Sequence, residues 1–393
     1  MSFVMDAMSL ATTQITEESA FLVVPKQSLN DPHRELVFFN PRMQLHRTLT
    51  SLAVGPALTR VKGSRLVDGL CSLGVRGIRY LKENRNVEHV TFVEANNHAI
   101  PLLKRNIRLN KLSKKNATVL FGDFNIVLNA LKERVDLIEL DPFGSPVFFL
   151  DTALRRLQRQ SILSITATDL ANLFGARPKP AVRHYDAKPL HVAYGHELAI
   201  RILLGRIARS AAIYDLAITP LLSFYEGHAV KCMVQLEKSV PAADEGLKHL
   251  GYVSHCASCL HRQTDRWPLK GCPACGNSMS YAGPLWTADT CDGVFLDQLL
   301  EENRVRHYSN QEKINHFLTT LKDEQGLAVG FFDLHRLAKR AGVSVPRMDR
   351  MLEVLRAQGF QAERSHCSPR GVKTNAPVAE VLSLLKAANQ LSA

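Results

Sequence analysis

Residues 66–79 read Leu-Val-Asp-Gly-Leu-Cys-Ser-Leu-Gly-Val-Arg-Gly-Ile-Arg, an apolar run followed by a turn that contains glycine. The run at 66–70 predicts a buried strand, and residues 75–83 predict the helix after it. Glycines at such a turn let a ligand approach the backbone closely, and the helix N-terminus favours an anionic group. The dinucleotide fingerprint G-x-G-x-x-G is absent, so we expect a carboxylate rather than a pyrophosphate at this turn.

The alternation of strands and helices continues downstream. We expect strands at 89–93, 118–121, 135–140 and 161–166, and helices at 99–109, 126–131 and 151–157. This order predicts an α/β fold, with a mostly parallel sheet and helices on both faces. Later segments that fit the same domain are a helix at 196–214 and strands at 217–222 and 229–236. Upstream, residues 15–40 read as short strands, such as Ala20–Val24 and Leu36–Phe39, and residues 41–60 as a helix.

The composition favours a polyanionic partner. The 393-residue chain carries 49 basic and 37 acidic residues, a net charge of +12, which suits nucleic acid or an anionic membrane surface. No run of about 18 apolar residues predicts a membrane span, and residues 1–13 do not resemble a signal peptide. We therefore expect a cytoplasmic protein of two or three domains, with no obligate protein partner evident.

Acidic side chains follow the second, third and fourth predicted strands. Glu94 lies where an acid suits hydrogen bonds to ribose hydroxyls. Asp123 lies where an acid suits an adenine amine, with the backbone N–H of Phe124 near a ring nitrogen. Each acid alone is more often a helix N-cap than a ligand. Together with the glycine turn, and with Arg47 or Arg76 as bidentate partner of a methionine carboxylate, they indicate a site for S-adenosylmethionine.

The acid after the fourth strand begins the hexapeptide Asp141-Pro142-Phe143-Gly144-Ser145-Pro146. In open α/β sheets, ligands bind outside the carboxyl ends of strands. There Asp141 and a carbonyl near Pro142 can accept hydrogen bonds from an exocyclic amine, while Phe143 stacks on the base. The alternative is a plain turn, because Asp, Pro, Gly and Ser all form turns. Asp169, after the next strand, either lines the same pocket or caps the following turn.

The chain contains two C-x-x-C pairs with twelve residues between them, Cys256 with Cys259 and Cys272 with Cys275. Four thiolates at this spacing satisfy tetrahedral zinc with no open position, so we expect a structural zinc knuckle within 250–285. Gly276 suits the tight turn after the second pair. The alternative is a set of four free thiols.

The C-terminal part has a different pattern. A boundary near 238–245 would separate a domain at 1–240 from an RNA-binding domain at 241–393. Within the latter, residues 310–390 read as a winged helix-turn-helix. Its expected elements are helices at 333–341 and 347–358, a turn at 342–345 and short strands near 368–371.

Basic side chains gather in two segments. They are Arg155, Arg156, Arg159, Arg177, Lys179, Arg183, His184 and Lys188, and then Arg336, Lys339, Arg340, Arg347 and Arg350. With Tyr185 interleaved, the first segment suits a phosphate backbone and base stacking. For any single residue the alternative is a solvated helix face. His196-Glu197 is a weak metal motif without a second histidine, so a buried structural role is expected there.

From about Val37 to about Asn375 the chain resembles the tRNA (guanine-26-N2)-dimethyltransferases, which are class I S-adenosylmethionine-dependent RNA methyltransferases. The segments that carry the resemblance are Phe-Asn-Pro-Arg-Met at 39–43, residues 72–79, the hexapeptide 141–146, Thr-Ala-Thr-Asp at 166–169, and Gly-His-Glu at 195–197. The resemblance implies a Rossmann-like sheet with an N-terminal β-rich extension, a zinc-knuckle insert and a C-terminal winged-helix-like α+β domain.

The resemblance also implies methyl transfer to N2 of guanine 26 of tRNA, with guanine 27 as a further candidate. The residues it implies are catalytic Asp141, with Pro142 and Phe143, and the cofactor contacts Arg47, Arg76, Glu94, Asp123 and the backbone near Phe124. The family usually reads Asn-Arg-Asp where this chain has His46-Arg47-Thr48, so the hydrogen bonds around Arg47 are expected to differ. The alternatives are an amino-group methyltransferase for another RNA or DNA base, and a non-catalytic zinc-knuckle and winged-helix nucleic-acid binder.

Overall fold

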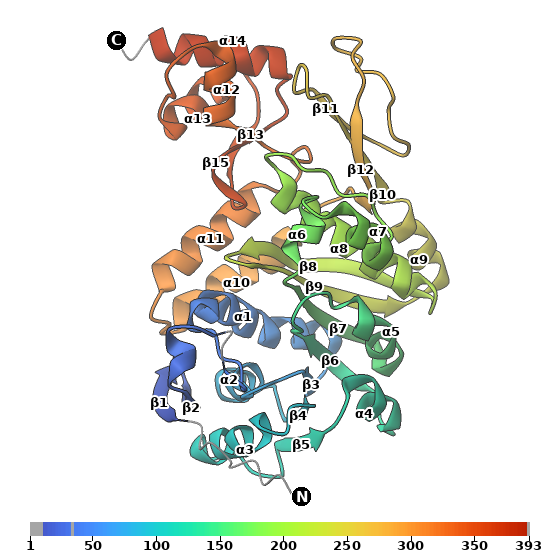
Figure 1. Cartoon of the computed structure of the whole chain (residues 1–393), viewed down its shortest axis with the longest axis vertical. Helices are drawn as coiled ribbons and strands as arrows, with labels where there is room; N and C mark the ends of the chain where they lie inside the picture. The colour runs from blue at the N-terminus through green and yellow to red at the C-terminus, as the bar shows by residue number, and fades with distance from the viewer. Residues whose placement is uncertain (1–10, 33–34, 391–393) are drawn as a thin grey trace, which may run out of the picture. The chain divides into compact units, whose positions relative to one another are not determined.

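The structure is a computed structural model and describes residues 11–32 and 35–390 (Figure 1). The chain divides into two compact units, residues 1–140 and 141–393. Both units combine helices with strands, as the predicted α/β class requires. Among the described residues, no helix is both long enough and apolar enough to cross a membrane.

The first unit is built on four parallel strands that alternate with helices. Its elements are β3 (Arg65–Gly69), α2 (Val75–Glu83), β4 (His89–Glu94), α3 (Ala99–Leu109), β5 (Ala117–Phe121), α4 (Phe124–Ala130) and β6 (Val135–Leu140). Strand β4 pairs with β5 on one side and β3 on the other, and β3 pairs with β6. The strands after β3 are added on one side of it, first β4 and then β5, whereas β6 is added on its other side. The strand order therefore reverses between β3 and β6, and their carboxyl ends form a topological switch point, where such sheets bind ligands.

Local sequence explains why these elements form where they do. Leu137, Ile138 and Leu140 of β6 are fully buried, as expected for a parallel strand covered on both faces. Gly74 precedes α2 with φ of +74°, a left-handed conformation that glycine adopts without strain. A Cβ at Gly74 would lie 2.4 Å from the side chain of Leu103, so close packing also requires glycine here.

The N-terminal extension begins with an antiparallel hairpin of β1 (Thr12–Glu17) and β2 (Ala20–Pro25). It continues through short helices η1 (Gln27–Leu29) and η2 (Pro41–Met43) into α1 (Gln44–Val61). The strand expected at 36–39 is wrong, because this segment forms bends and irregular backbone. Two backbone carbonyls of this segment accept hydrogen bonds from side chains rather than from a neighbouring strand. Asn96 Nδ2 donates to Leu36 O at 2.6 Å, and Ser72 Oγ donates to Phe38 O at 2.8 Å.

The second unit opens with three antiparallel strands and their helices. The elements are α5 (Val147–Arg156), β7 (Leu157–Ala167), α6 (Leu170–Leu173), α7 (Pro178–Tyr185), α8 (Gly195–Ala212), β8 (Leu216–Glu226) and β9 (Ala229–Lys238). Strand β9 pairs with both β7 and β8. Helix α5 begins four residues before the expected 151, directly after Pro146 at its N-cap.

A second, smaller antiparallel sheet follows. Its elements are α9 (Val240–Leu247), β10 (Leu250–His255), β11 (Arg262–Asp265) and β12 (Ser280–Trp286), with α10 (Gly293–Val305) and α11 (Gln311–Asp323) after them. The central strand is β10, flanked by β11 and β12. Pro241 lies in the first turn of α9, where a missing N–H costs nothing.

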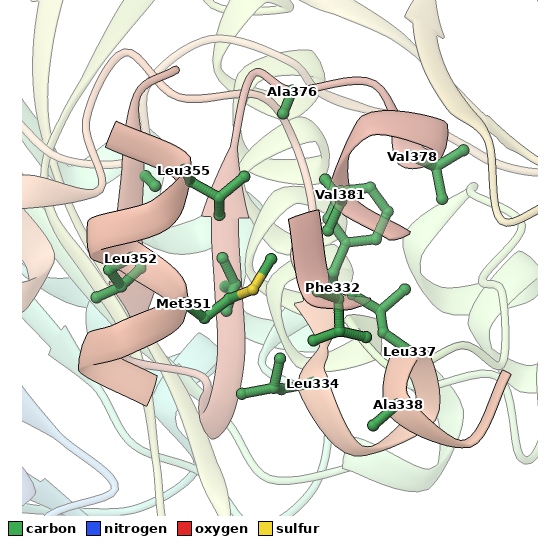
Figure 2. Close-up of a cluster of buried hydrophobic side chains, with 13 residues drawn as sticks. Phe332, Leu334, Leu337, Ala338, Met351, Leu352, Leu355, Ala376, Val378 and Val381 are labelled. Atoms are coloured by element: carbon green, nitrogen blue, oxygen red, sulfur yellow. The ribbon is translucent and has the colours of Figure 1, made fainter. Parts of the chain in front are cut away.

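The C-terminal part has the expected order of two helices and a small sheet (Figure 1). Its elements are β13 (Phe332–Asp333), α12 (Leu334–Ala341), α13 (Met348–Ala357), β14 (Ala362–Ser365), β15 (Ser368–Thr374) and α14 (Val378–Gln390). Figure 2 shows their common apolar core, in which Phe332, Leu337, Met351, Leu355 and Val381 converge. Gly342 ends α12 with φ of +68°, which produces the sharp turn between the two helices.

A buried charged network joins the C-terminal part to α8. Glu197 on α8 accepts a hydrogen bond from Lys373 Nζ of β15 at 2.9 Å, and Arg201 lies 3.0 Å away on the next turn. Lys373 also lies 3.7 Å from Glu324, which is 2.8 Å from His366 Nδ1. Glu197 is therefore a structural residue, as expected for the His196-Glu197 pair.

Candidate active site

The glycine turn between β3 and α2 is held by the carboxylate of Glu94. Its Oε2 accepts a hydrogen bond from the backbone N–H of Ser72 at 2.5 Å, and its Oε1 accepts one from Asn96 N at 2.7 Å. Leu70 and Ser72 have φ of +62° and +47°, conformations that need such support. Glu94 is only 8% exposed, so a charged group lies buried beside the turn, where a ribose-binding acid is expected.

Asp123 takes the N-cap role that is common for an acid before a helix. Its Oδ1 accepts hydrogen bonds from Asn125 N at 2.9 Å and Ile126 N at 3.1 Å, and the side chain remains exposed. Phe124 is buried against the backbone of β3, because a Cβ at Gly69 would lie 2.5 Å from its ring. The ring is therefore a packing element, and only the backbone of Phe124 is suited to contact a ligand.

Arg47 is buried in α1 and faces a carboxylate of the N-terminal hairpin. Its Nε and Nη2 donate to the two oxygens of Glu17 at 2.7 and 2.5 Å, and its Nη1 donates to Asn40 O at 3.0 Å. Arg79 Nη1 reaches the same carboxylate at 3.1 Å and Thr48 Oγ1 at 2.9 Å. Burial alone raises the pKa of Glu17, but Arg47 and Arg79 together hold that pKa below its ordinary value.

Arg76 lies in a second buried cluster. Its Nη2 is 3.0 Å from His46 Nδ1, and its Nε is 3.8 Å from Glu139 Oε1 at the end of β6. Tyr80 donates its hydroxyl to Glu139 Oε2 at 3.0 Å. The sequence predicted roles for both arginines but gave no sign of Glu17 and Glu139, because neither acid belongs to a motif and each is more than 25 residues from its arginine in the chain.

In the second unit, the hexapeptide forms an ordered loop ahead of α5. Gly144 N donates to Thr168 Oγ1 at 2.7 Å, and Thr168 N donates to Gly144 O at 3.0 Å. Pro142 is buried, Asp141 is half-buried, and the ring of Phe143 is 68% exposed. The loop thus presents an aromatic ring to solvent beside a carboxylate, and the Thr-Ala-Thr-Asp segment holds it in place.

Tyr185 does not lie on the surface, contrary to the expectation that it stacks on RNA. It is fully buried, its hydroxyl donates to Asp169 Oδ1 at 2.6 Å, and it also hydrogen-bonds with Ser145 of the hexapeptide. Burial raises the pKa of Tyr185, and the Asp169 carboxylate raises it further. Asn172 Nδ2 donates to Asp169 Oδ2 at 2.9 Å, so both oxygens of Asp169 are hydrogen-bonded, one to Tyr185 and one within its own turn.

The basic residues of the first segment are mostly on the surface. The exposed ones are Arg155, Arg159, Arg177, Lys179, Arg183 and Lys188. His184 contacts the exposed ring of Phe148 on α5, with centroids 5.2 Å apart. In the C-terminal segment, Arg340 donates to the carbonyl of Ser258, so that arginine also joins α12 to the first C-x-x-C pair.

The four cysteines of the two C-x-x-C pairs come together, with all sulfur atoms within 4.8 Å of one another. Cys256 Sγ is 3.6 Å from Cys275 Sγ, and Cys259 Sγ is 3.5 Å from Cys272 Sγ. Thiolates about 2.3 Å from one tetrahedral ion lie roughly 3.8 Å apart, so the cluster fits a metal ion. The donor set of four sulfurs favours zinc over calcium or magnesium.

Comparisons with known proteins agree with this architecture. Residues 18–386 match the family of N2,N2-dimethylguanosine tRNA methyltransferases. A tRNA (guanine(26)-N(2))-dimethyltransferase of Methanobrevibacter smithii is 33% identical over 89% of this chain and 91% of its own length. One from Pyrococcus abyssi is 34% identical over 95% of this chain and 99% of its own.

A solved structure of Trm1 from Pyrococcus horikoshii, in complex with S-adenosyl-L-methionine, has a TM-score of 0.84 and 31% identity, and the match covers 95% of this chain and 99% of that one. Neither alternative function is favoured by these matches. The chain therefore belongs to the N2,N2-dimethylguanosine tRNA methyltransferase family and is, as its sequence predicted, an enzyme that methylates N2 of guanine in tRNA.

Proposed function

We propose that this enzyme transfers one or two methyl groups from S-adenosylmethionine to N2 of guanine 26 in tRNA, with Asp141 as its catalytic carboxylate. The observation that carries the assignment of Asp141 is the braced loop in which it lies. Thr168 fixes Gly144 through two hydrogen bonds, and Tyr185, whose hydroxyl donates to Asp169, hydrogen-bonds with Ser145. A loop fixed in this way holds a half-buried carboxylate and an exposed ring in one arrangement before the substrate arrives.

Guanine N2 is a weak nucleophile, because its lone pair is delocalised into the ring. Hydrogen bonds from N2–H to Asp141, and to a carbonyl near Pro142, favour the localised amine that forms as the methyl group is transferred. Asp141 then accepts the departing proton as general base. Phe143 stacks on the guanine, which must leave the folded tRNA at a cost of a few kcal/mol.

S-adenosylmethionine supplies an electrophilic methyl group when it is bound. The residues that would hold it are Glu94 for the ribose hydroxyls, Asp123 and the backbone of Phe124 for the adenine, and Arg47 or Arg76 for the carboxylate. Three of the five N–H groups of Arg47 are used by Glu17 and Asn40, which leaves two for a further acceptor. A carboxylate such as Glu94 has about four acceptor positions, and the structure uses two of them.

Zinc is the proposed occupant of the four-cysteine cluster, with a structural role. Backbone hydrogen bonds shape a knuckle around each pair: Leu260 N donates to Cys256 O at 2.9 Å, and Gly276 N donates to Cys272 O at 2.8 Å. Both donors have positive φ, +66° and +74°. Four thiolates leave no open position for substrate, so the ion stabilises the fold and takes no part in methyl transfer.

The domain roles and the compartment are part of the same proposal. Residues 1–240 carry the methyltransferase chemistry, and residues 241–393 bind the tRNA through the knuckle and the winged-helix-like part. The exposed cations Arg177, Lys179 and Arg183 contact phosphates, so tRNA affinity falls steeply with salt. We expect the enzyme to act in the cytoplasm.

The decisive experiment compares Asp141→Ala and Asp141→Asn with the unaltered enzyme on a tRNA transcript that contains guanine 26. Both variants should bind tRNA normally and lose methyl transfer, because asparagine preserves shape but cannot accept the proton. Mass spectrometry of nuclease-digested tRNA identifies the methylated position, and a transcript with adenine at position 26 serves as control. Near-normal turnover by either variant would falsify the assignment.

A further inference from the structure

Trp267 is an exposed aromatic side chain that the methyl-transfer chemistry leaves without a role. It lies in the loop after β11, inside the four-cysteine region, and 68% of it is exposed to solvent. Tryptophan buries more apolar area than other side chains and is enriched at binding surfaces. A tryptophan this exposed is a candidate contact for a binding partner when other aromatic and charged side chains lie near it.

The loop of Trp267 crosses a particular face of the β11-β10-β12 sheet. Leu269 N donates to Ser254 Oγ at 2.9 Å, so the loop passes over the side of β10 to which Ser254 points. Tyr281 of β12 lies directly opposite Ser254 and is therefore on the same side. Tyr252 shares it too, since its ring meets that of Tyr281 edge-on at 5.8 Å.

A lysine contacts one of these rings, and further cations flank Trp267 in the chain. Lys188 is tied to β12 by reciprocal backbone hydrogen bonds with Gly283, both at 2.8 Å. This anchor places its ammonium 4.1 Å from the centroid of the Tyr281 ring. Arg266 and Lys270 flank Trp267 in the chain and are exposed. We call this side of the sheet and the loop that crosses it the tryptophan face, with Tyr252, Tyr281 and Lys188 on the sheet side and Arg266, Trp267 and Lys270 in the loop.

We propose that the tryptophan face binds an unpaired base of the tRNA substrate, with Trp267 stacked on the base and the flanking cations on its phosphates. Exposed aromatic rings interleaved with lysine and arginine are typical of surfaces for single-stranded RNA, because every base has a stacking face and every linkage a charge. The chain's net charge of +12 favours the same polyanion. This inference rests on the proposed function, since it deepens how the tRNA is held.

The chain offers a built-in reporter for this contact. It has two tryptophans, and the other one, Trp286, is 3% exposed and donates its indole N–H to Asp289 O at 2.9 Å. Titration of the zinc-loaded enzyme with tRNA should quench the emission of Trp267 and leave that of Trp286 as a constant background. Trp267→Phe should abolish the quenching while retaining most of the affinity, because phenylalanine still stacks.

Trp267→Ala should weaken tRNA binding roughly five- to hundredfold, the range for removal of one stacking partner. Val305→Ala is the matched control, because Val305 is equally exposed, at 71%, at the end of α10, and it should leave affinity unchanged. If the enzyme binds and methylates tRNA but the emission of Trp267 is not quenched, the tryptophan face does not bind the tRNA. The proposed function would remain intact in that case. If instead the enzyme methylates no tRNA, the proposed function fails first. A change from dimer to monomer in Trp267→Ala would identify the face as a protein contact and overturn the proposal.

Discussion

Gly144 and Thr168 are joined by two reciprocal hydrogen bonds, from Gly144 N to Thr168 Oγ1 at 2.7 Å and from Thr168 N to Gly144 O at 3.0 Å. They lie 24 residues apart, one in the loop after β6 and the other directly after β7. The first bond depends on a side chain and can be removed by substitution, whereas the second depends on backbone alone. Thr168 is therefore the point at which the position of the Asp141 loop can be tested.

Thr168→Val should lower kcat and leave the KM for tRNA nearly unchanged. Valine has the shape of threonine but no acceptor, so the N–H of Gly144 loses its partner at a cost of about 1–3 kcal/mol. The loop then shifts, and a displacement of about 1 Å at a reacting group costs on the order of a hundredfold in rate. Steady-state kinetics with tRNA as the varied substrate measure both constants.

Thr168→Ser is the control for this prediction, because serine retains the hydroxyl and should retain most of the activity. A Thr168→Val enzyme with unaltered kcat would show that the loop holds its position without this bond. A fall in kcat for both variants would instead point to the lost methyl group and to packing.

The sequence predicted those parts of the fold that are determined by residues close together in the chain. Helices α2 and α3 and strand β6 have the expected bounds, because their apolar periodicity is local. The partners of buried charges were not predicted. Glu17 reaches Arg47 across 30 residues, and only packing of the hairpin against α1 and α2 brings them together.

The candidate site residues also divide into those placed by a local rule and those placed by packing. Glu94 and Asp123 were proposed as ligand contacts because acids at strand ends follow a positional rule, and these roles stay predictions. Tyr185 was misplaced because basic neighbours in the chain suggested a surface, while α7 turns its ring inward towards Asp169. The side on which a residue of a short helix lies is decided by what packs against it, which no single segment reveals.

Glu17→Gln should destabilise the protein and weaken binding of S-adenosylmethionine. The substitution leaves the guanidinium groups of Arg47 and Arg79 buried against a neutral amide, and removal of one partner of a buried pair costs about 3–5 kcal/mol. Arg47 then loses the anchor that orients its remaining N–H groups. Thermal unfolding and calorimetric titration with the cofactor measure the two effects.

Glu133→Gln is the matched control, because Glu133 also pairs with an arginine, Arg65, but both side chains are more than half exposed. Exposed pairs contribute about 0–1 kcal/mol, so this variant should unfold and bind like the unaltered enzyme. Equal effects of the two substitutions would contradict a special role for Glu17.

Removal of one knuckle thiolate should release zinc. Cys272→Ser replaces a buried thiol of the proposed zinc site, 3.5 Å from Cys259 Sγ, with a hydroxyl that binds zinc poorly. The purified enzyme should contain one zinc per chain by elemental analysis and the variant far less, with lower thermal stability because metal binding and folding are coupled. Cys71→Ser, outside the cluster, should keep its zinc. The zinc site would be contradicted if the unaltered enzyme contained no zinc after gentle purification and unfolded at the same temperature as the Cys272→Ser variant.

Acid should unfold the protein partly through Glu197. Burial by itself raises the pKa of this carboxyl, but Lys373 and Arg201 outweigh it and lower the pKa from 4.5 to about 2. The depressed pKa means that the native state gains stability from ionised Glu197 above pH 4.5. That stability is lost as the pH falls from 4.5 towards 2, because the unfolded chain binds the proton first. The shift corresponds to a contribution on the order of 3 kcal/mol.

Glu197→Gln should therefore be less stable at neutral pH and lose less stability on acidification. Chemical denaturation at several pH values between 7 and 3 gives the free energy of unfolding of the variant and of the unaltered enzyme. The difference between the two separates the contribution of Glu197 from those of Glu17 and Glu83, whose pKa values are also lowered. Glu301→Gln, which removes an exposed partner of Arg304, should follow the unaltered enzyme throughout. Parallel curves for the Glu197 variant and the unaltered enzyme would show that the carboxyl titrates normally. The link between α8 and β15 would then owe its stability to packing rather than charge.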